Sequence, residues 1–206
     1  MNGSDDQDLK QSVFIIEDDP AIAEALRDLL DSVGIAVRYF PSAENFTDAW
    51  SPGLPGCLVV DVRLPGMSGM ELQAHLAESG NEIPIILMTA HGDIPMVRKA
   101  LKSGAVEFLT KPFQDEELLQ AVQHAFALDR ERRAKTRVAE SIRARIQSLS
   151  VRERQVVEMV TSGLTNREIA EKLYLSVVTI KLYRRLAMEK MRVDTLADLV
   201  KMWEKR

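Results

Sequence analysis

Five short apolar runs alternate with segments of helical periodicity in the first 128 residues, and this alternation constrains the fold more than any other feature. The runs lie at 13–16, 35–40, 58–62, 83–88 and 105–109. Strands that alternate with helices form βαβ units and a parallel sheet with helices on both faces. The runs are continuously apolar, as expected of strands buried on both sides. The sequence therefore predicts an α/β fold with a doubly wound, five-stranded parallel sheet.

The chain beyond residue 128 has no strand pattern. Residues 129–147 are highly charged, but apolar side chains at 138, 142, 146 and 149 follow helical spacing. This pattern predicts a helical connector, with a charged flexible linker as the alternative. Residues 150–206 have the pattern of four short helices. Two of them, joined by a short turn near 173–175, outline a helix-turn-helix.

Polar residues stand where these four helices are expected to begin. In a capping box, a Ser or Thr N-cap is followed three residues later by Glu, and each side chain bonds the other's backbone N–H. Two of the four positions have a Glu at that spacing. We expect the N-caps to be Ser150, Thr165, Ser176 and Asp194.

Charge is distributed unevenly along the chain. Residues 1–128 hold 8 Lys and Arg against 20 Asp and Glu, whereas residues 129–206 hold 19 against 11. The basic part is a candidate for binding nucleic acid, with a solvated basic surface as the alternative. The polar, acidic start does not resemble a signal peptide, and no apolar run reaches the ~18 residues of a membrane span, so no membrane association is expected. Cys57 is the only cysteine, which fits a reduced, cytoplasmic location and a small buried side chain.

Polar side chains follow the ends of four predicted strands. Glu17 and Asp18 follow the first, Asp61 ends the third, Thr89 the fourth, and Lys111 follows the fifth. Ligands of open parallel sheets bind outside the carboxyl ends of the strands. If these strands are neighbours, the five side chains converge on one pocket.

The chemistry of such a pocket suits phosphoryl transfer. Three nearby carboxylates repel one another unless a cation compensates, and oxygen-rich sites suit Mg²⁺. Lys111 adds a positive charge and Thr89 a hydroxyl donor, which together suit a phosphoryl group. Asp61 would accept that group as an acyl phosphate. Taken singly, each residue also has a structural explanation; Asp19 before Pro20, for example, is expected to be a helix N-cap.

Several segments resemble a known family. FIIEDD, VVDVRLPGMSG, ILMTAHGD and EFLTKPF resemble the signature segments of the receiver domain of two-component response regulators, and the segment from LSVRERQVVEMV to LYRRLAMEKM resembles a LuxR-type helix-turn-helix. Together they resemble the NarL/FixJ group, and its FixJ-like branch best. The resemblance implies a flavodoxin-like receiver at 12–128, a helical linker at 129–147 and a smaller all-α DNA-binding domain at 148–206. It implies a phosphorylation-dependent transcription regulator and not an enzyme.

The resemblance also implies a metal site. Asp61 would be phosphorylated by a partner histidine kinase. Asp18 and Asp61 would bind Mg²⁺ directly, with the backbone carbonyl of Arg63 as a third protein ligand. Glu17, where the family often has Asp, would contribute through water.

Further roles around the phosphoryl group follow from the resemblance. Thr89 would bond it and Lys111 would pair with it, and the Lys111–Pro112 bond would be cis. Phe108 takes the place of the switch aromatic, where it can pack but not hydrogen-bond. Arg63 and His91 stand at positions that tune the lifetime of the phosphate.

The second helix of a helix-turn-helix enters the major groove, and here it spans about 176–190. Lys181, Arg184 and Arg185 stand at i, i+3 and i+4 and are expected to share one face, with Ile180 and Ala187 packed inward. By resemblance, Lys181, Leu182 and Arg185 would approach bases of double-stranded promoter DNA. The phosphate contacts would come from Arg184, Thr179, Ser176, Tyr183 and Asn166.

A single module of this size buries little DNA, so dimerisation is expected. By resemblance, phosphorylated receivers form a homodimer, through residues on or near Ile94, Val97, Arg98, Lys99, Leu101 and Lys102. Two alternatives remain. A dehalogenase-type phosphatase would need a second Asp two residues after Asp61, where Arg63 stands. A binding module that dimerises constitutively would not need the acidic pocket.

Overall fold

The computed structural model describes residues 10–50, 53–90, 92 and 94–204. The chain divides into two compact units, Met1–Arg132 and Arg133–Arg206. Each unit has its own hydrophobic clusters. The domain boundaries expected at 128/129 and 147/148 stay predictions.

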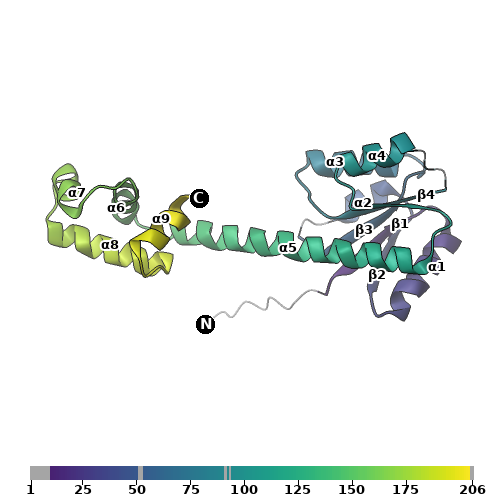
Figure 1. Ribbon diagram of the computed structural model, residues 1–206, viewed down its shortest axis with the longest axis horizontal. Coiled ribbons are helices and arrows are strands. Elements are labelled where there is room, and N and C mark those ends of the chain that lie inside the picture. Colours follow the sequence, from purple (N-terminus) through teal and green to yellow (C-terminus); the bar gives the residue numbers. More distant parts are fainter. Residues whose placement is uncertain (1–9, 51–52, 91, 93, 205–206) are drawn as a thin grey trace. The chain divides into compact units, whose positions relative to one another are not determined.

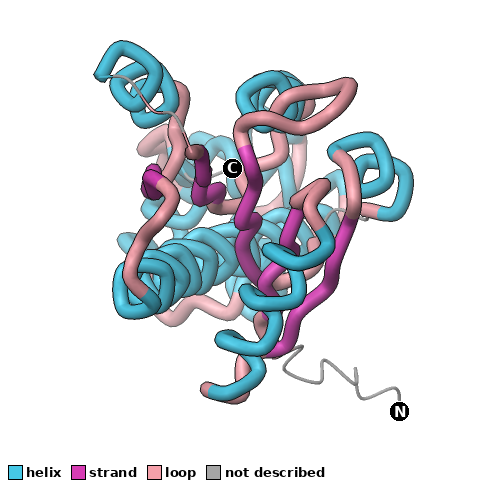
Figure 2. The backbone as a smooth tube through the Cα atoms, turned by 90° about the vertical axis from the view of Figure 1, so that its right-hand side faces the viewer, coloured by secondary structure: helices cyan, strands magenta, loops and turns pink. Residues whose placement is uncertain are grey.

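The first unit is built on a five-stranded, entirely parallel sheet (Figures 1 and 2). The strand order is β2-β1-β3-β4-β5, so the chain winds outward in both directions from β1 and β3. This confirms the predicted doubly wound fold. The strands are β1 Ser12–Ile16, β2 Ala36–Phe40, β3 Gly56–Asp61, β4 Ile85–Thr89 and β5 Glu107–Thr110.

Helices cover both faces of this sheet (Figure 1). Side chains alternate along β1: Val13 and Ile15 join a cluster with residues of α1 and α5, and Phe14 and Ile16 join one with residues of α2, α3 and α4. The central strands β1, β3 and β4 are almost wholly buried, whereas β2 and β5 are partly exposed because they form the two edges. The helices are α1 Pro20–Ser32, α2 Ala43–Ala49, α3 Gly69–Glu78, α4 Ile94–Lys102 and α5 Asp115–Gln147.

Helix α5 contributes to the cores of both units. It is a single helix of 33 residues, so residues 129–147 are helical. Leu118 and Val122 belong to the core under the sheet, whereas Ile142 and Ile146 belong to a cluster of the second unit. Three of the four apolar positions predicted in the connector, Ile142, Ile146 and Leu149, therefore pack within the second unit, whereas Val138 is 57% exposed.

The second unit contains the helices α6 to α9. Their N-caps are formed by residues close in sequence. Ser150 and Thr165 form the two predicted capping boxes, and Ser176 accepts from the Thr179 N–H, as predicted. The fourth prediction is wrong by one residue. The Oγ1 of Thr195, not Asp194, accepts from the first-turn N–H of Asp198 at 3.1 Å. The helices are α6 Val151–Thr161, α7 Asn166–Leu173, α8 Val177–Met191 and α9 Leu196–Glu204.

A buried carboxylate connects α5 to the amino-terminal end of β3. Asp129 is fully buried. Its Oδ2 accepts from the backbone N–H of Gly56 (3.0 Å) and the side chain of Gln11 (3.2 Å), and its Oδ1 accepts from Arg132 (2.7 Å). Asp129 falls in the predicted charged connector, and no local pattern in the sequence distinguishes it from the other charged residues there.

A second buried carboxylate ties together three parts of the C-terminal unit. Glu153 closes the capping box of α6, and its Oε2 also accepts from Lys190 Nζ of α8 at 2.7 Å. The Lys190 Nζ donates to the Ser148 carbonyl as well. Burial alone would raise the pKa of Glu153, but the hydrogen bonds from Lys190 and Ser150 outweigh it and hold the pKa below its ordinary value.

Replacing Asp129 by Ala is expected to destabilise the first unit by about 2–4 kcal/mol. The backbone N–H of Gly56 and the guanidinium of Arg132 would both lose their buried acceptor. The chain has two tryptophans, Trp50 and Trp203, one in each unit. Denaturant unfolding followed by Trp50 fluorescence in a Trp203→Phe background measures the change. The exposed Asp28→Ala should change stability by no more than about 0.5 kcal/mol. Equal stability of the two variants would refute the anchoring role.

The stability of the second unit should depend on Glu153 at acid pH. Because its pKa is lower in the folded state than in the unfolded state, Glu153 stabilises the fold above its ordinary pKa of 4.5. That stabilisation is lost as the pH falls from about 4.5 through the folded pKa. Trp203 fluorescence in a Trp50→Phe background should show a shallower loss of stability between pH 5 and about 3 for Glu153→Gln. The exposed Glu158→Gln should keep the parental slope.

Candidate functional site

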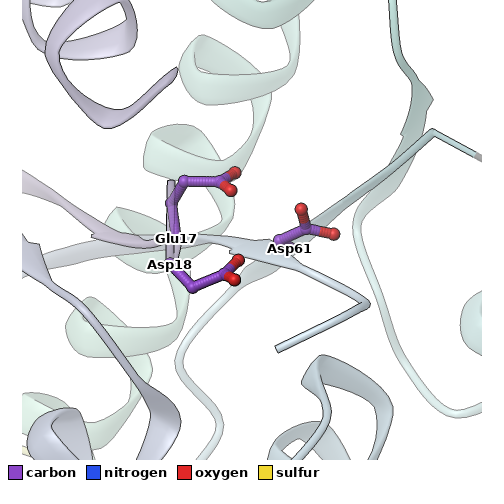
Figure 3. Close-up of side chains that lie close together, drawn as sticks. All are labelled: Glu17, Asp18 and Asp61. Atoms are coloured by element: carbon purple, nitrogen blue, oxygen red, sulfur yellow. The ribbon is translucent and has the colours of Figure 1, made fainter. Parts of the chain in front are cut away.

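Three carboxylates meet at the carboxyl ends of β1 and β3 (Figure 3). Glu17 and Asp18 follow β1, and Asp61 is the last residue of β3. One oxygen from each lies within 4.8 Å of the others. Glu17 and Asp61 are 1% and 8% exposed, whereas Asp18 faces solvent. In Figure 3 the side chains of Glu17 and Asp18 extend together toward the strand end that bears Asp61.

Lys111 joins two of these carboxylates. Its Nζ donates to Glu17 Oε2 and to Asp61 Oδ2, both at 2.7 Å, and its side chain is 15% exposed. Lys111 follows β5, and its backbone N–H donates to the Thr89 carbonyl at 2.7 Å. The Lys111–Pro112 bond is cis. The structure thus brings together four of the residues that the sequence analysis placed in one pocket.

Burial and charge act against each other in this group. Burial raises the pKa of Glu17 and outweighs the lowering by Lys111, and the negative Asp61 adds to the rise. Burial would lower the pKa of Lys111, but the hydrogen bonds and charges of Asp61 and Glu17 outweigh it and raise that pKa. Lys111 is therefore a fixed cation beside Asp61.

Backbone contacts fix the direction of these side chains. The N–H of Arg63 donates to Asp61 Oδ1 at 3.0 Å. Asp19 is the N-cap of α1, as predicted, and accepts from the N–H groups of Ala21 and Ile22. The N–H of Asp19 also lies 3.4 Å from Glu17 Oε1. Asp19 is thus explained by capping, whereas Glu17 and Asp18 remain available to the pocket.

Gly69, which the sequence analysis did not single out, lets α3 approach the end of β3. A Cβ on Gly69 would overlap the carbonyl oxygen of Asp61 and lie 3.0 Å from Val60 Cγ1. Its N–H donates to the Val62 carbonyl at 3.1 Å. Glycine is required here because the helix approaches the backbone of Asp61 closely. The only sequence signal for this requirement is that Gly69 ends the segment VVDVRLPGMSG.

Thr89 and Phe108 occupy the neighbouring strands. Thr89 ends β4 and is fully buried, and Phe108 lies on β5, half-buried against the core. Gly92 lies against both: a Cβ there would come within 2.8 Å of the Phe108 ring and 3.3 Å of Thr89 Cγ2. His91, expected to tune the lifetime of the phosphate, lies outside the described residues.

The cluster formed by the carboxylates of Glu17, Asp18 and Asp61 fits a magnesium ion. One oxygen from each carboxylate lies within 4.8 Å of the others, so a single ion among them would find oxygen ligands of the kind that Mg²⁺ prefers. Three carboxylates and one lysine leave two negative charges when all are ionised, which a divalent cation neutralises. The exposure of Asp18 leaves room for the water ligands that Mg²⁺ retains.

The second candidate surface is the exposed face of α8. Lys181, Leu182 and Arg185 are exposed on this helix, while Ile180 and Ala187 are fully buried, as predicted. Arg184 lies at the side of this face, toward α7. It is half-buried, and its Nη1 lies 3.4 Å from Asn166 Oδ1 of α7.

The other predicted phosphate contacts lie around the start of α8 and its flank. Ser176 and Thr179 have hydroxyl oxygens 2.7 Å apart, and Ser176 caps the helix. Tyr183 is half-buried and packs against the cluster of Val156 and Ile169. DNA contacts by these residues stay predictions.

Comparison with known families now identifies the chain. Residues 13–123 match the response regulator receiver domain, and residues 147–203 match the bacterial regulatory proteins of the luxR family. The chain is a response regulator of the NarL/FixJ group. The resemblance of its sequence segments to that family is thereby confirmed.

The regulator is similar to its relatives over almost its whole length. Nodulation protein W of Bradyrhizobium diazoefficiens is 45% identical over 204 residues, which cover 99% of this chain and 90% of that protein. The transcriptional regulatory protein FixJ of the same organism is 42% identical over 194 residues, 94% of each chain. The solved structure of response regulator StyR matches 96% of this chain and 100% of that chain at 43% identity, with a TM-score of 0.88.

Membership in this family establishes the general function. The regulator is a phosphorylation-dependent transcription regulator of a two-component system, with a receiver and a DNA-binding domain, and the family is not one of enzymes. A histidine kinase and DNA are therefore its implied partners. None of the helices that the structure describes combines the length and apolar character needed to cross a bilayer.

Replacing Gly69 by Ala is expected to displace the backbone of Asp61, because its Cβ overlaps a carbonyl oxygen that cannot swing away. Overpacking of this kind costs about 1–3 kcal/mol of unfolding free energy. Labelling by a small phosphodonor should slow in parallel. Ser68→Ala is the matched control: loss of this N-cap costs about 1 kcal/mol but leaves Asp61 in place, so labelling should not change. Equal labelling rates in the two variants would refute the positioning role.

Proposed function

We propose that Asp61 is the phosphoryl acceptor and that the partner histidine kinase is the donor. The observation that carries this proposal is the Asp61 carboxylate bonded to Lys111 beside Glu17 and Asp18. Asp61 lies at the rim of the sheet and is 8% exposed, so a carboxylate oxygen can attack phosphorus while the donor stays in solvent. Attack by Asp61 forms a new O–P bond, and the bond from phosphorus to the donor imidazole breaks.

The proposed metal ligands are Asp18, Asp61 and the backbone carbonyl of Arg63, with Glu17 bonded through water. Their support is the clustered oxygens and the charge of the pocket. A bound Mg²⁺ would supply charge neutralisation between the carboxylates and the incoming phosphoryl oxygens. Asp61 Oδ1 is held by the Arg63 N–H and Oδ2 by Lys111, so the carboxylate is already oriented.

Thr89, Lys111 and Phe108 are proposed to respond to the phosphoryl group. Lys111 exchanges a carboxylate partner for a phosphoryl oxygen, and the Thr89 hydroxyl donates to another. Because Phe108 has no hydroxyl, its response is a change of packing within the space bounded by Gly92 and the core. Phosphorylation shifts the receiver only to the extent that it stabilises one packing more than the other.

The exposed face of α8 is proposed to enter the major groove of promoter DNA. Lys181, Leu182 and Arg185 are the proposed base contacts, supported by their common exposure opposite the buried face of the helix. The proposed phosphate contacts position the helix without reading sequence. They are Ser176, Thr179, Tyr183, Arg184 and Asn166.

A homodimer of phosphorylated chains is the proposed DNA-binding form. On α4, Ile94 is 76% and Leu101 44% exposed, so this helix offers apolar surface to a partner. A surface depression of about 470 Å³ runs beside Ile94, lined by Arg98, Lys99 and Lys102 among others. This face is the proposed contact between receivers. A cytoplasmic location belongs to the same proposal, because the regulator must reach both kinase and DNA.

Incubating the full chain with acetyl phosphate and Mg²⁺ is expected to add one phosphoryl group, seen by intact mass, and to shift the protein to a dimer in sizing. Asp61→Asn should abolish labelling, and EDTA should suppress it in the parental protein. The Lys111→Met variant should still be phosphorylated but should no longer dimerise, because the phosphoryl oxygen would lack the Lys111 ammonium group as its partner. The exposed Asp48→Asn should behave like the parental protein.

Selection of bound duplexes from a random DNA pool completes the test. The phosphorylated protein should enrich a defined sequence and bind it at least about 10-fold more tightly than the unphosphorylated form. Retention of the label in Asp61→Asn would place the acceptor elsewhere. Binding by Asp61→Asn as tight as that of the phosphorylated protein would favour constitutive dimerisation.

A further inference from the structure

Helix α8 carries an exposed apolar side chain in line with its basic ones. Val178 is 77% exposed, one of the highest values among the large apolar residues that the structure describes. With Lys181, Leu182 and Arg185 it stands at i, i+3, i+4 and i+7, so the four share one face of the helix. Ala187, which is fully buried, lies about half a turn away around the helix axis. The face that bears Val178 is therefore the one opposite the core.

Neither packing nor helix formation accounts for a valine at this position. The side chain has little burial to gain, since most of its surface is exposed. β-Branched residues also form helices less readily than straight-chain ones. The start of α8 is already capped by Ser176, whose Oγ accepts from the Thr179 N–H at 3.0 Å. A polar residue would satisfy all these local requirements better.

The chemistry of valine restricts what it can contact on DNA. It has no donor or acceptor, so it cannot bond phosphate oxygens or the polar edges of bases. The apolar group that base pairs present in the major groove is the C5-methyl of thymine. The first residues of a recognition helix are those that approach base edges, and Val178 is the second residue of α8.

We propose that Val178 is a specificity-determining residue that reads a thymine methyl group, and that Leu182 reads a second one. This inference rests on the proposed entry of α8 into the major groove. Lys181 and Arg185, the proposed polar base contacts, lie on the same face, and the two apolar side chains add discrimination of thymine from cytosine, which lacks the methyl group.

The spacing of the two side chains predicts the spacing of the two methyl groups. Four residues of helix advance about 6 Å. Successive base pairs are about 3.4 Å apart. Because a recognition helix can cross the groove at an angle, the thymines read by Val178 and Leu182 are expected no more than about two base pairs apart, on either strand, in each half-site.

The test uses the full-length chain, with or without acetyl phosphate, in whichever form enriches duplexes from a random pool. Each thymine of the enriched sequence is then replaced singly by uracil, which removes only the methyl group. For the parental protein, two positions per half-site should lose about 4-fold in affinity, the effect expected for one buried methyl. Val178→Ala should abolish the loss at one position, and Leu182→Ala at the other.

The control is Val151→Ala, which removes a valine of similar exposure, 76%, from α6. It should keep both uracil effects. Equal uracil profiles for Val178→Ala and the parental protein would overturn the assignment of Val178, even though both bind the selected site. If no protein enriches any duplex, the proposed DNA binding fails and the inference with it. The entry of α8 into the groove and the reading of methyl groups have separate readouts. Arg185→Ala should lose binding if α8 enters the groove, whereas the uracil profile of the parental protein tests the reading of methyl groups.

Discussion

Two buried carboxylates share one ammonium group at the rim of the sheet, and the charge balance of the pocket depends on this contact. Lys111 lies 2.7 Å from both Glu17 and Asp61. Carboxylates held this close repel one another, so the site is tolerable only with a compensating charge. Removing that charge would leave buried anions unpaired, at a cost far above that of a surface ion pair. The strand order makes the contact possible, because β1, β3, β4 and β5 are adjacent and parallel and so end at the same edge.

The same geometry connects Asp61, the proposed acceptor, to the surface. Asp61, Thr89 and Phe108 stand on three successive strands, and Gly92 leaves just enough space beside the Phe108 ring. Helix α4 follows directly and is tied to α3 where the buried Gln73 donates to the Ala100 carbonyl at 3.0 Å. A close-packed interior responds to a new charge by changing between packings and not by deforming continuously. The proposed phosphoryl group on Asp61 would act on the exposed face of α4 through such a change of packing.

The two units have separate cores, and α5 supplies residues to each. Asp129 fastens the helix to the receiver through the N–H of Gly56, and Ile142 and Ile146 pack within the DNA-binding unit. In that unit, helix α8 has one buried face and one exposed face. The face bearing Ile180 and Ala187 is buried, and the opposite face offers charge together with exposed apolar groups. Charged side chains and apolar groups thus lie side by side on the one face of α8 that is left free of the core.

The sequence by itself determined whatever depends on near neighbours in the chain. Alternating apolar runs specified the parallel sheet, and the spacing of Ser150 and Thr165 from their glutamates specified two helix starts, because these patterns act within a few residues. Residue type alone does not choose between Asp194 and Thr195, since both cap well, but the three-residue spacing from Thr195 to Asp198 is a local signal for Thr195 that the prediction missed. Tertiary structure alone decided that Asp129 is buried, since its partner Gly56 lies 73 residues away in the chain. It likewise decided that α3 presses against the Asp61 carbonyl and that Val178 is left exposed, because burial is a property of surfaces that meet only after folding.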